Sequence, residues 1–195
     1  LAALRDAQMV KTAYAFGLRR TETRMLDVVD FGPNPAASEF GNYGALYVRY
    51  GKAQRGSPPK RRSVLTVWPW VVPVLEQWFG EVRPLLAGDG PAAWPSERAV
   101  RITSPSVDAL LRQARTAISL DPVLDFHSLR RSYVTHLIED GWDPRFVQDQ
   151  VGHEHASTTS IYTGVSSDFR VRTLRRALDQ IIADTVGPHH EEEAR

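Results

Sequence analysis

The strand-forming residues of this chain fall mainly in two short segments, and a strongly basic stretch lies between them. Ala45 to Tyr50 and Ser63 to Val67 are rich in β-branched and aromatic residues, as half-buried strands are. The stretch from Lys52 to Arg62 contains five lysines and arginines and no acidic residue. We therefore predict an α+β fold that is mainly α-helical, with a small antiparallel β-hairpin or three-stranded sheet.

Helical periodicity and helix-ending residues describe most of the remaining sequence. We predict a helix over residues 3–16 that ends at Gly17, a second helical stretch from Thr21 to Val29, and a loop over 31–44. Ser104-Pro105 and Asp143-Pro144 are typical of helix starts, and we expect Ser104 and Asp143 to be the N-caps. Further helices are predicted over residues 71–79, 107–118, 127–139, 145–151 and 168–183.

Length and composition limit the possible chemistry. The 195 residues, 42% of them hydrophobic, suit one compact domain. The chain has no cysteine, which excludes disulfides and thiolate metal sites, so a nucleophile would be Ser, Thr, Tyr, Lys, His or a carboxylate. The longest uncharged apolar run, 63–75, contains two prolines and is too short to span a bilayer. We expect a soluble, cytoplasmic protein and, because it begins at Leu1, a fragment of a longer one.

The net charge of +1 hides an uneven distribution. The tail from His189 to Arg195 holds three glutamates and one arginine, so the rest of the chain is more basic than the total suggests. The basic stretch is suited to face phosphates, although a solvated loop has the same composition.

Four residues in the second half of the chain have a distinctive order and spacing. His127 and Arg130 open a predicted helix and lie one turn apart on the same face, so that both can approach one anion. His153 follows Gly152 at a predicted helix end, and Tyr162 follows nine residues later. Each residue alone is a weak signal, since single histidines are often surface residues and single tyrosines are often core.

The segment from His127-Ser-Leu-Arg130 through Gly152-His153 to Tyr162-Thr resembles the second conserved box of the tyrosine recombinases, the phage integrase family. Upstream, Gly17-Leu-Arg19-Arg-Thr-Glu22 resembles the first box of that family. Tyr50-Gly51-Lys52 stands at a strand end, where the family carries a catalytic lysine on a β-hairpin. The resemblance therefore covers nearly the whole chain.

The resemblance implies a set of catalytic residues and the domain organisation. The implied catalytic residues are Arg19, Lys52, His127, Arg130, His153 and Tyr162, with Glu22 in a supporting role. Glu22 could instead only pair with a nearby arginine, and Lys60 could replace Lys52, because the basic loop is longer than the family's usual turn. We expect the catalytic domain over 1–186, an acidic disordered tail over 187–195, and no N-terminal core-binding domain in this chain.

These residue types fit one reaction. A phosphodiester under attack becomes a five-coordinate phosphorane, whose extra negative charge Arg19 and Arg130 could bind at any working pH. A neutral tyrosine is a poor nucleophile, so Tyr162 needs positive charge nearby and a base such as His127. His153 would hydrogen-bond the phosphate, and Lys52 would protonate the leaving 5′ oxygen. The expected product is a 3′-phosphotyrosine, formed without a metal or cofactor.

The resemblance also implies the partners, which are double-stranded DNA and other protomers of the same protein. We expect a tetramer in which the helix over 168–183 is exchanged, although ordinary core packing explains its apolar stripe equally well. The residues expected to contact DNA are Arg55, Lys60, Arg61, Arg62 and Arg131.

Three other interpretations use the same residues. A type IB topoisomerase-like enzyme shares the chemistry but relaxes supercoils, and the tight spacing of the motifs favours a recombinase over it. A DNA-binding module without activity would not need all six catalytic residue types. A metal-dependent hydrolase could use His127, His153 and His155, but two histidines two positions apart point poorly at one metal, so we expect His155 to be exposed.

Overall fold

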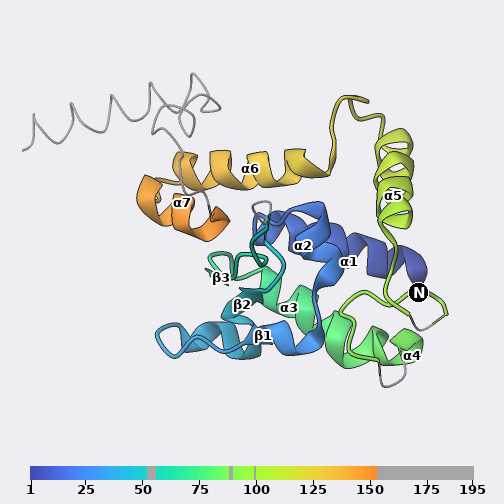
Figure 1. The fold of residues 1–195 in the computed structure, drawn as a ribbon, viewed down its shortest axis with the longest axis horizontal. Coiled ribbons are helices and arrows are strands. Elements are labelled where there is room, and N and C mark those ends of the chain that lie inside the picture. Colours follow the sequence, from blue (N-terminus) through green and yellow to red (C-terminus); the bar gives the residue numbers. More distant parts are fainter. Residues whose placement is uncertain (52–55, 88–89, 99, 153–195) are drawn as a thin grey trace, which may run out of the picture.

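A computed structural model describes residues 1–51, 56–87, 90–98 and 100–152, and shows helices grouped around a small antiparallel sheet (Figure 1). The elements are α1 (Ala2–Ala15), α2 (Arg20–Met25), β1 (Phe31–Gly32), β2 (Ala45–Val48), β3 (Arg62–Leu65), α3 (Val71–Glu76), α4 (Pro84–Ala87), α5 (Ser104–Ala117), α6 (Phe126–Glu139) and α7 (Pro144–Val151). The predicted α+β fold class is confirmed. The predicted helix over 168–183 and the acidic tail lie outside the described residues.

The sheet has the order β1-β2-β3, and both pairings are antiparallel. Leu46 of β2 pairs with Phe31 on one side and with Val64 on the other. Val48 pairs with Arg62, so the predicted hairpin is correct. Beyond this pair, the backbone N–H of Gly51 donates to the carbonyl of Lys60 at 2.9 Å and closes the base of the basic loop.

The larger hydrophobic core lies between α1, α3, α5 and the sheet. At its centre Met9, Phe16, Leu46, Trp78 and Trp94 are completely buried. A smaller core joins α6 and α7 and contains Tyr133, Leu137 and Val147. Helix α1 contacts both α3 and α6, and therefore links the two cores (Figure 1).

Local capping explains where α6 and α7 begin and end. Asp125 and Ser128 cap the start of α6 reciprocally, each side chain accepting from the other's backbone N–H at 2.9 and 3.1 Å. Asp143 accepts from two backbone N–H groups at the start of α7. Gly152 ends α7 with a left-handed φ of 63°. The sequence predicted both helices correctly.

Three expectations for other segments need correction. The helix expected from Thr21 to Val29 stops at Met25, and a separate 3-10 turn follows over Val28–Asp30. The segment 31–44 is not only loop, because it holds β1 and a 3-10 segment over Ser38–Tyr43. The N-cap of α5 is Thr103 and not Ser104, since the Thr103 hydroxyl accepts from the backbone N–H of Ser106.

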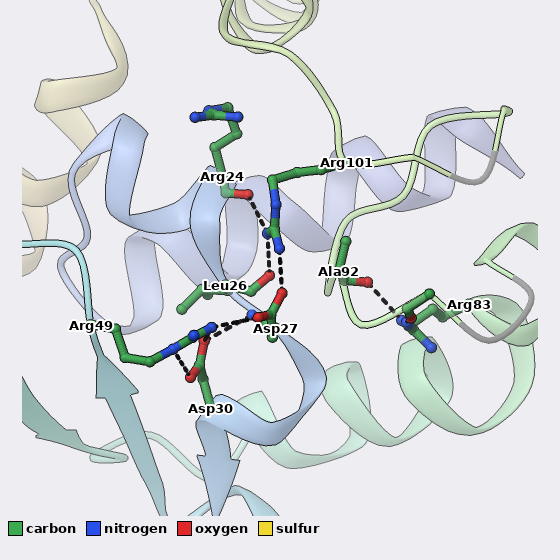
Figure 2. Close-up of polar contacts among 9 residues, drawn as sticks. Arg24, Leu26, Asp27, Asp30, Arg49, Arg83, Ala92 and Arg101 are labelled. Carbon is green, nitrogen blue, oxygen red and sulfur yellow. Dashed lines mark hydrogen bonds and ion pairs between the residues drawn. The ribbon is translucent and has the colours of Figure 1, made fainter.

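A cluster of ion pairs fixes the far end of α2 (Figure 2). Arg101 donates to the carbonyls of Arg24 and Leu26 at 3.0 and 2.7 Å, and also pairs with Asp27. Arg49, just after β2, binds Asp27 and Asp30, each at 2.6 Å. The carbonyls of Arg24 and Leu26 are thereby satisfied, and the end of α2 is tied to both the sheet and the segment before α5.

None of the described helices combines the length and the apolar character needed to cross a bilayer.

Candidate active site

Glu22 lies at the centre of a cluster of arginine side chains. It is in the first turn of α2, and its carboxylate is only 1% exposed. One oxygen accepts from the backbone N–H of Arg19 at 2.9 Å, and the other accepts from the Arg19 guanidinium at 2.7 Å. Arg62, at the start of β3, donates to both oxygens at 2.8 and 2.9 Å. A single carboxylate thus holds two guanidiniums from separate elements.

The arginines determine the charge of Glu22. Burial by itself would raise the pKa of its carboxyl group, but the hydrogen bonds and charges of Arg62 and Arg19 outweigh burial and lower the pKa to about 2. Glu22 is therefore ionised at neutral pH. Within the described ranges, Glu22 is one carboxylate among three nearby guanidiniums, those of Arg19, Arg62 and Arg130, so these groups together carry a net positive charge that favours an anion.

Arg130 lies almost completely buried in α6. Its Nη1 donates to the carbonyl of Gly17 at 2.7 Å, and its Nη2 donates to the carbonyl of Val151. Among the described residues, no acceptor is bonded to its Nε. Burial, followed by the charge of Arg19, lowers the pKa of Arg130 to about 9, against the opposing effect of Glu22. Arg130 therefore stays charged at neutral pH, and an anion at this place would relieve the cost of its burial.

Gly17 allows α1 and α6 to approach closely at this site. Its φ is 56°, and a Cβ atom there would lie 2.5 Å from the ring of Tyr133. The carbonyl that Arg130 binds belongs to the same residue. Gly17 thus ends α1, accommodates the Tyr133 ring and orients a backbone acceptor for Arg130. The sequence had suggested only the first of these roles.

His127 stands at the exposed start of α6, one turn before Arg130. The protein removes part of the water around its ring, and this partial desolvation and then the charge of Arg130 lower the pKa of His127, with smaller contributions from Arg131 and Arg19, while Asp125 opposes the shift. The imidazole is therefore mostly neutral at pH 7. A neutral imidazole beside cationic groups can accept a proton from a nucleophile.

The sequence did not reveal where the side chain of Arg62 points. In addition to Glu22, it donates from Nε to the carbonyl of Gln150 in α7 at 2.9 Å. The side-chain amide of Gln150 in turn bonds the backbone N–H and carbonyl of Leu65, at 2.8 and 3.0 Å. These contacts join β3 to the last turn of α7. The sequence could not predict these contacts, because Arg62 appears there only as the last residue of the basic stretch.

The arrangement can bind an anion with several oxygens beside a neutral base. Glu22 orients Arg19, two backbone carbonyls orient Arg130, and the two guanidiniums lie near enough for the charge of Arg19 to affect the pKa of Arg130. Fixed guanidiniums stabilise charge that develops on a phosphoryl group without needing to rearrange during the reaction.

Comparison with known proteins identifies the family. The model of the phage integrase family matches residues 1–168. The chain belongs to the phage integrase family. This confirms the resemblance seen in the motifs around Arg19 and His127.

The curated relatives of this chain include tyrosine recombinases of several bacteria. It is 33% identical to tyrosine recombinase XerC of Chromohalobacter salexigens over 162 residues, which are 83% of this chain and 48% of the relative. It is 32% identical to XerC of Mycobacterium sp. strain KMS, over 91% of this chain and 54% of the relative. The chain thus spans about half the length of these relatives.

Solved structures share the fold. XerA recombinase matches with a TM-score of 0.66 at 22% identity, over 96% of this chain and 58% of that one. The catalytic core of lambda integrase matches with a TM-score of 0.55 at 19% identity, over 78% of this chain and 82% of that one. The fold of the phage integrase family is therefore present here.

The structure brings together Arg19, Glu22 and Arg130, with His127 one turn away on α6. Three further residues implied by the family, Lys52, His153 and Tyr162, lie outside the described residues, as do Arg55 and His155. Of the residues expected to contact DNA, Arg61 and Arg131 are exposed, Lys60 is half-buried, and Arg62 points into the cluster toward Glu22. Contact with DNA stays a prediction for all of them.

Proposed function

We propose that this chain is the catalytic part of a site-specific DNA recombinase, which cuts and rejoins strands through a covalent bond between Tyr162 and a DNA phosphate. The observation that carries the proposal is the convergence of two oriented guanidiniums, Arg19 and Arg130, on one buried carboxylate in a member of the phage integrase family. A relative of the same fold, XerH, has been solved bound to its difH substrate, which supports DNA as the partner.

The proposed reaction is a transesterification. The phenolic oxygen of Tyr162 attacks the phosphorus, its proton passes to His127, and the bond to the 5′ oxygen breaks. Lys52, or Lys60 in its place, gives the leaving 5′ oxygen a proton. Arg19 and Arg130 bind the non-bridging oxygens while these gain charge, and His153 would donate a further hydrogen bond.

The product retains the energy of the phosphodiester in a 3′-phosphotyrosine. A free 5′-hydroxyl from another strand can therefore attack it and restore a DNA backbone without ATP. Exchange between two DNA sites needs several protomers, and we propose a tetramer in which residues 168–183 contact a neighbour. The reaction would take place on DNA in the cytoplasm.

The covalent intermediate gives a direct test. Duplex DNA with a nick near the cleavage position loses its short 5′-hydroxyl fragment and traps the adduct, which migrates as a slower band on a denaturing gel. For this the chain, or the longer protein that contains it, is incubated with nicked substrates carrying candidate sites. We expect an adduct with the natural sequence and none with Tyr162→Phe, while DNA binding is largely kept.

Tyr47→Phe is the matched control, because it removes the same hydroxyl from an exposed tyrosine of β2. An adduct that persists in Tyr162→Phe would identify another nucleophile and contradict the proposal. Relaxation of supercoiled plasmid without any strand exchange would favour the topoisomerase-like alternative. Loss of the adduct on adding a chelator would favour a metal-dependent reaction.

A further inference from the structure

The guanidinium of Arg62 joins three elements that meet at the proposed active site. Its Nη1 and Nη2 bind the two oxygens of Glu22 in α2, its Nε binds the carbonyl of Gln150 in α7, and its backbone begins β3. The side chain is only 12% exposed. Three of its five N–H groups are thus used within the protein, in directions fixed by the planar guanidinium.

The end of α7 is held by two arginines. The last carbonyls of a helix have no partner within that helix. Arg62 donates to the carbonyl of Gln150, and Arg130 donates to that of Val151. Both guanidiniums also lie against Glu22, at 2.8 and 3.9 Å. The charge of Glu22 and the negative end of the α7 dipole are therefore neutralised together.

Gly152 shows how closely the Arg62 side chain packs against the point where the chain leaves α7. A Cβ atom at Gly152 would lie 2.9 Å from the Cδ of Arg62, and the φ of Gly152 is 63°. Gln150 adds a second connection, since its amide bonds both backbone groups of Leu65 in β3. The last turn of α7 and Gly152 are thus held by contacts with β3.

We propose that Arg62 is a positioning residue for DNA cleavage, which orients Glu22 and the end of α7 and does not itself bind the DNA phosphate. The inference rests on the proposed function. It replaces the expectation that Arg62 contacts DNA together with its neighbours in the basic stretch. Arg62 acts on the reaction in two ways: through Glu22 it orients Arg19, and through the carbonyl of Gln150 it fixes the end of α7, directly before His153 in the sequence.

A double-mutant cycle distinguishes positioning by Arg62 through Glu22 from direct contact of Arg62 with the DNA phosphate. The variants are Glu22→Gln, Arg62→Gln and the pair together, and the double variant keeps the net charge of the natural chain. If Arg62 acts through Glu22, either single substitution should slow single-turnover adduct formation about 10- to 100-fold, and the double variant should be no slower than the slower single variant. Affinity of the double variant for duplex DNA should change by less than about threefold.

A direct phosphate contact would give the opposite result. The rate losses of the two single substitutions would multiply in the double variant, and its affinity for DNA would fall about tenfold or more. Either result overturns the proposal. Arg20→Gln is the matched control, because it breaks an exposed arginine–carboxylate pair with Asp108 beside the site, and it should leave the rate within about threefold.

Thermal unfolding of the natural chain, the two single variants and the double variant tests, independently of activity, whether Arg62 and Glu22 are coupled. The fall in melting temperature of the double variant should be clearly smaller than the sum of the two single falls. Additive falls would show that Arg62 and Glu22 are not coupled and would overturn the proposal. A natural chain that forms no adduct at all would contradict the proposed function, and the unfolding cycle would still decide whether Arg62 acts through Glu22.

Discussion

The Nη1 of Arg130 lies 3.9 Å from Oε2 of Glu22, and both side chains are 1% exposed. The two groups form an ion pair, but the distance is too long for a hydrogen bond. Glu22 therefore offsets the charge of Arg130 while the N–H groups of Arg130 remain available for other acceptors. Those groups are directed to the carbonyls of Gly17 and Val151, which set the plane of the guanidinium. The fixed plane, together with an Nε that has no acceptor in the described part of the chain, suits Arg130 to a role that a more flexible cation could not fill.

We therefore expect Arg130→Lys to lower the rate of adduct formation on the order of 100- to 1,000-fold, while DNA affinity changes much less. A lysine ammonium is a point charge and cannot reach the carbonyls of Gly17 and Val151 while also binding a phosphate oxygen. Single-turnover cleavage of nicked duplex measures the effect. Arg112→Lys, on an exposed position of α5, serves as control. A variant that cleaves at nearly the natural rate would show that Arg130 has a structural role only.

The depressed pKa of Glu22 links stability to pH. In the folded chain this pKa is about 2, below its ordinary value of 4.5, so its ionisation stabilises the fold above pH 4.5. This contribution, about 3 kcal/mol, is lost as pH falls from about 5 to 2. The gap in unfolding free energy between the natural chain and Glu22→Gln should shrink by that amount over this range.

Urea unfolding at several pH values measures this gap. Glu39→Gln, at an exposed glutamate, should leave the pH dependence of the unfolding free energy nearly unchanged. Parallel curves for the natural chain and Glu22→Gln would mean that the arginines around Glu22 do not lower its pKa.

Gly17→Ala should destabilise the chain by about 2–4 kcal/mol, because the left-handed backbone disfavours a Cβ atom and that atom would meet the Tyr133 ring. Gly141→Ala is a close control. Gly141 also has a positive φ, of 86°, but a Cβ atom there meets nothing within 4 Å, so about 1 kcal/mol is expected. Chemical denaturation measures both. Equal losses would show that the ring of Tyr133 moves away at no cost.

Lys52→Ala should strongly slow cleavage of ordinary DNA, and a substrate with sulfur at the 5′-bridging position should largely restore the rate. A sulfur leaving group needs no proton, so the missing acid no longer matters. Lys60→Ala, tested on both substrates, distinguishes the two candidate lysines. Slow cleavage of the sulfur substrate by Lys52→Ala would assign the acid role to Lys60 or to another group.

Local signals account for the parts of the fold that the sequence predicted well. Asp125, Asp143 and Gly152 act within one helical turn of their own positions, so their effect can be read from neighbouring residues. The premature end of α2 depends instead on Arg101, which binds the carbonyls of Arg24 and Leu26 from a distant segment. Such a contact leaves no periodic pattern in the sequence.

The same distinction applies to the candidate site. Arg19, Glu22, His127 and Arg130 could be proposed from motif spacing, and the structure brings the first two together with Arg130. The position of Arg62 could not be predicted, since its partners Glu22 and Gln150 are remote in sequence and its neighbours Lys60 and Arg61 are basic as well. Its burial distinguishes it from Arg61 only once the chain is folded.

The amide of Gln150 has a further consequence for how the molecule behaves at high concentration. An outer strand such as β3 normally presents free peptide groups on which another polypeptide can add a strand and start aggregation. At Leu65 both of these groups are already bonded by Gln150, and α7 lies over them. The helix thereby covers this part of the β3 edge, where an added strand would otherwise pair.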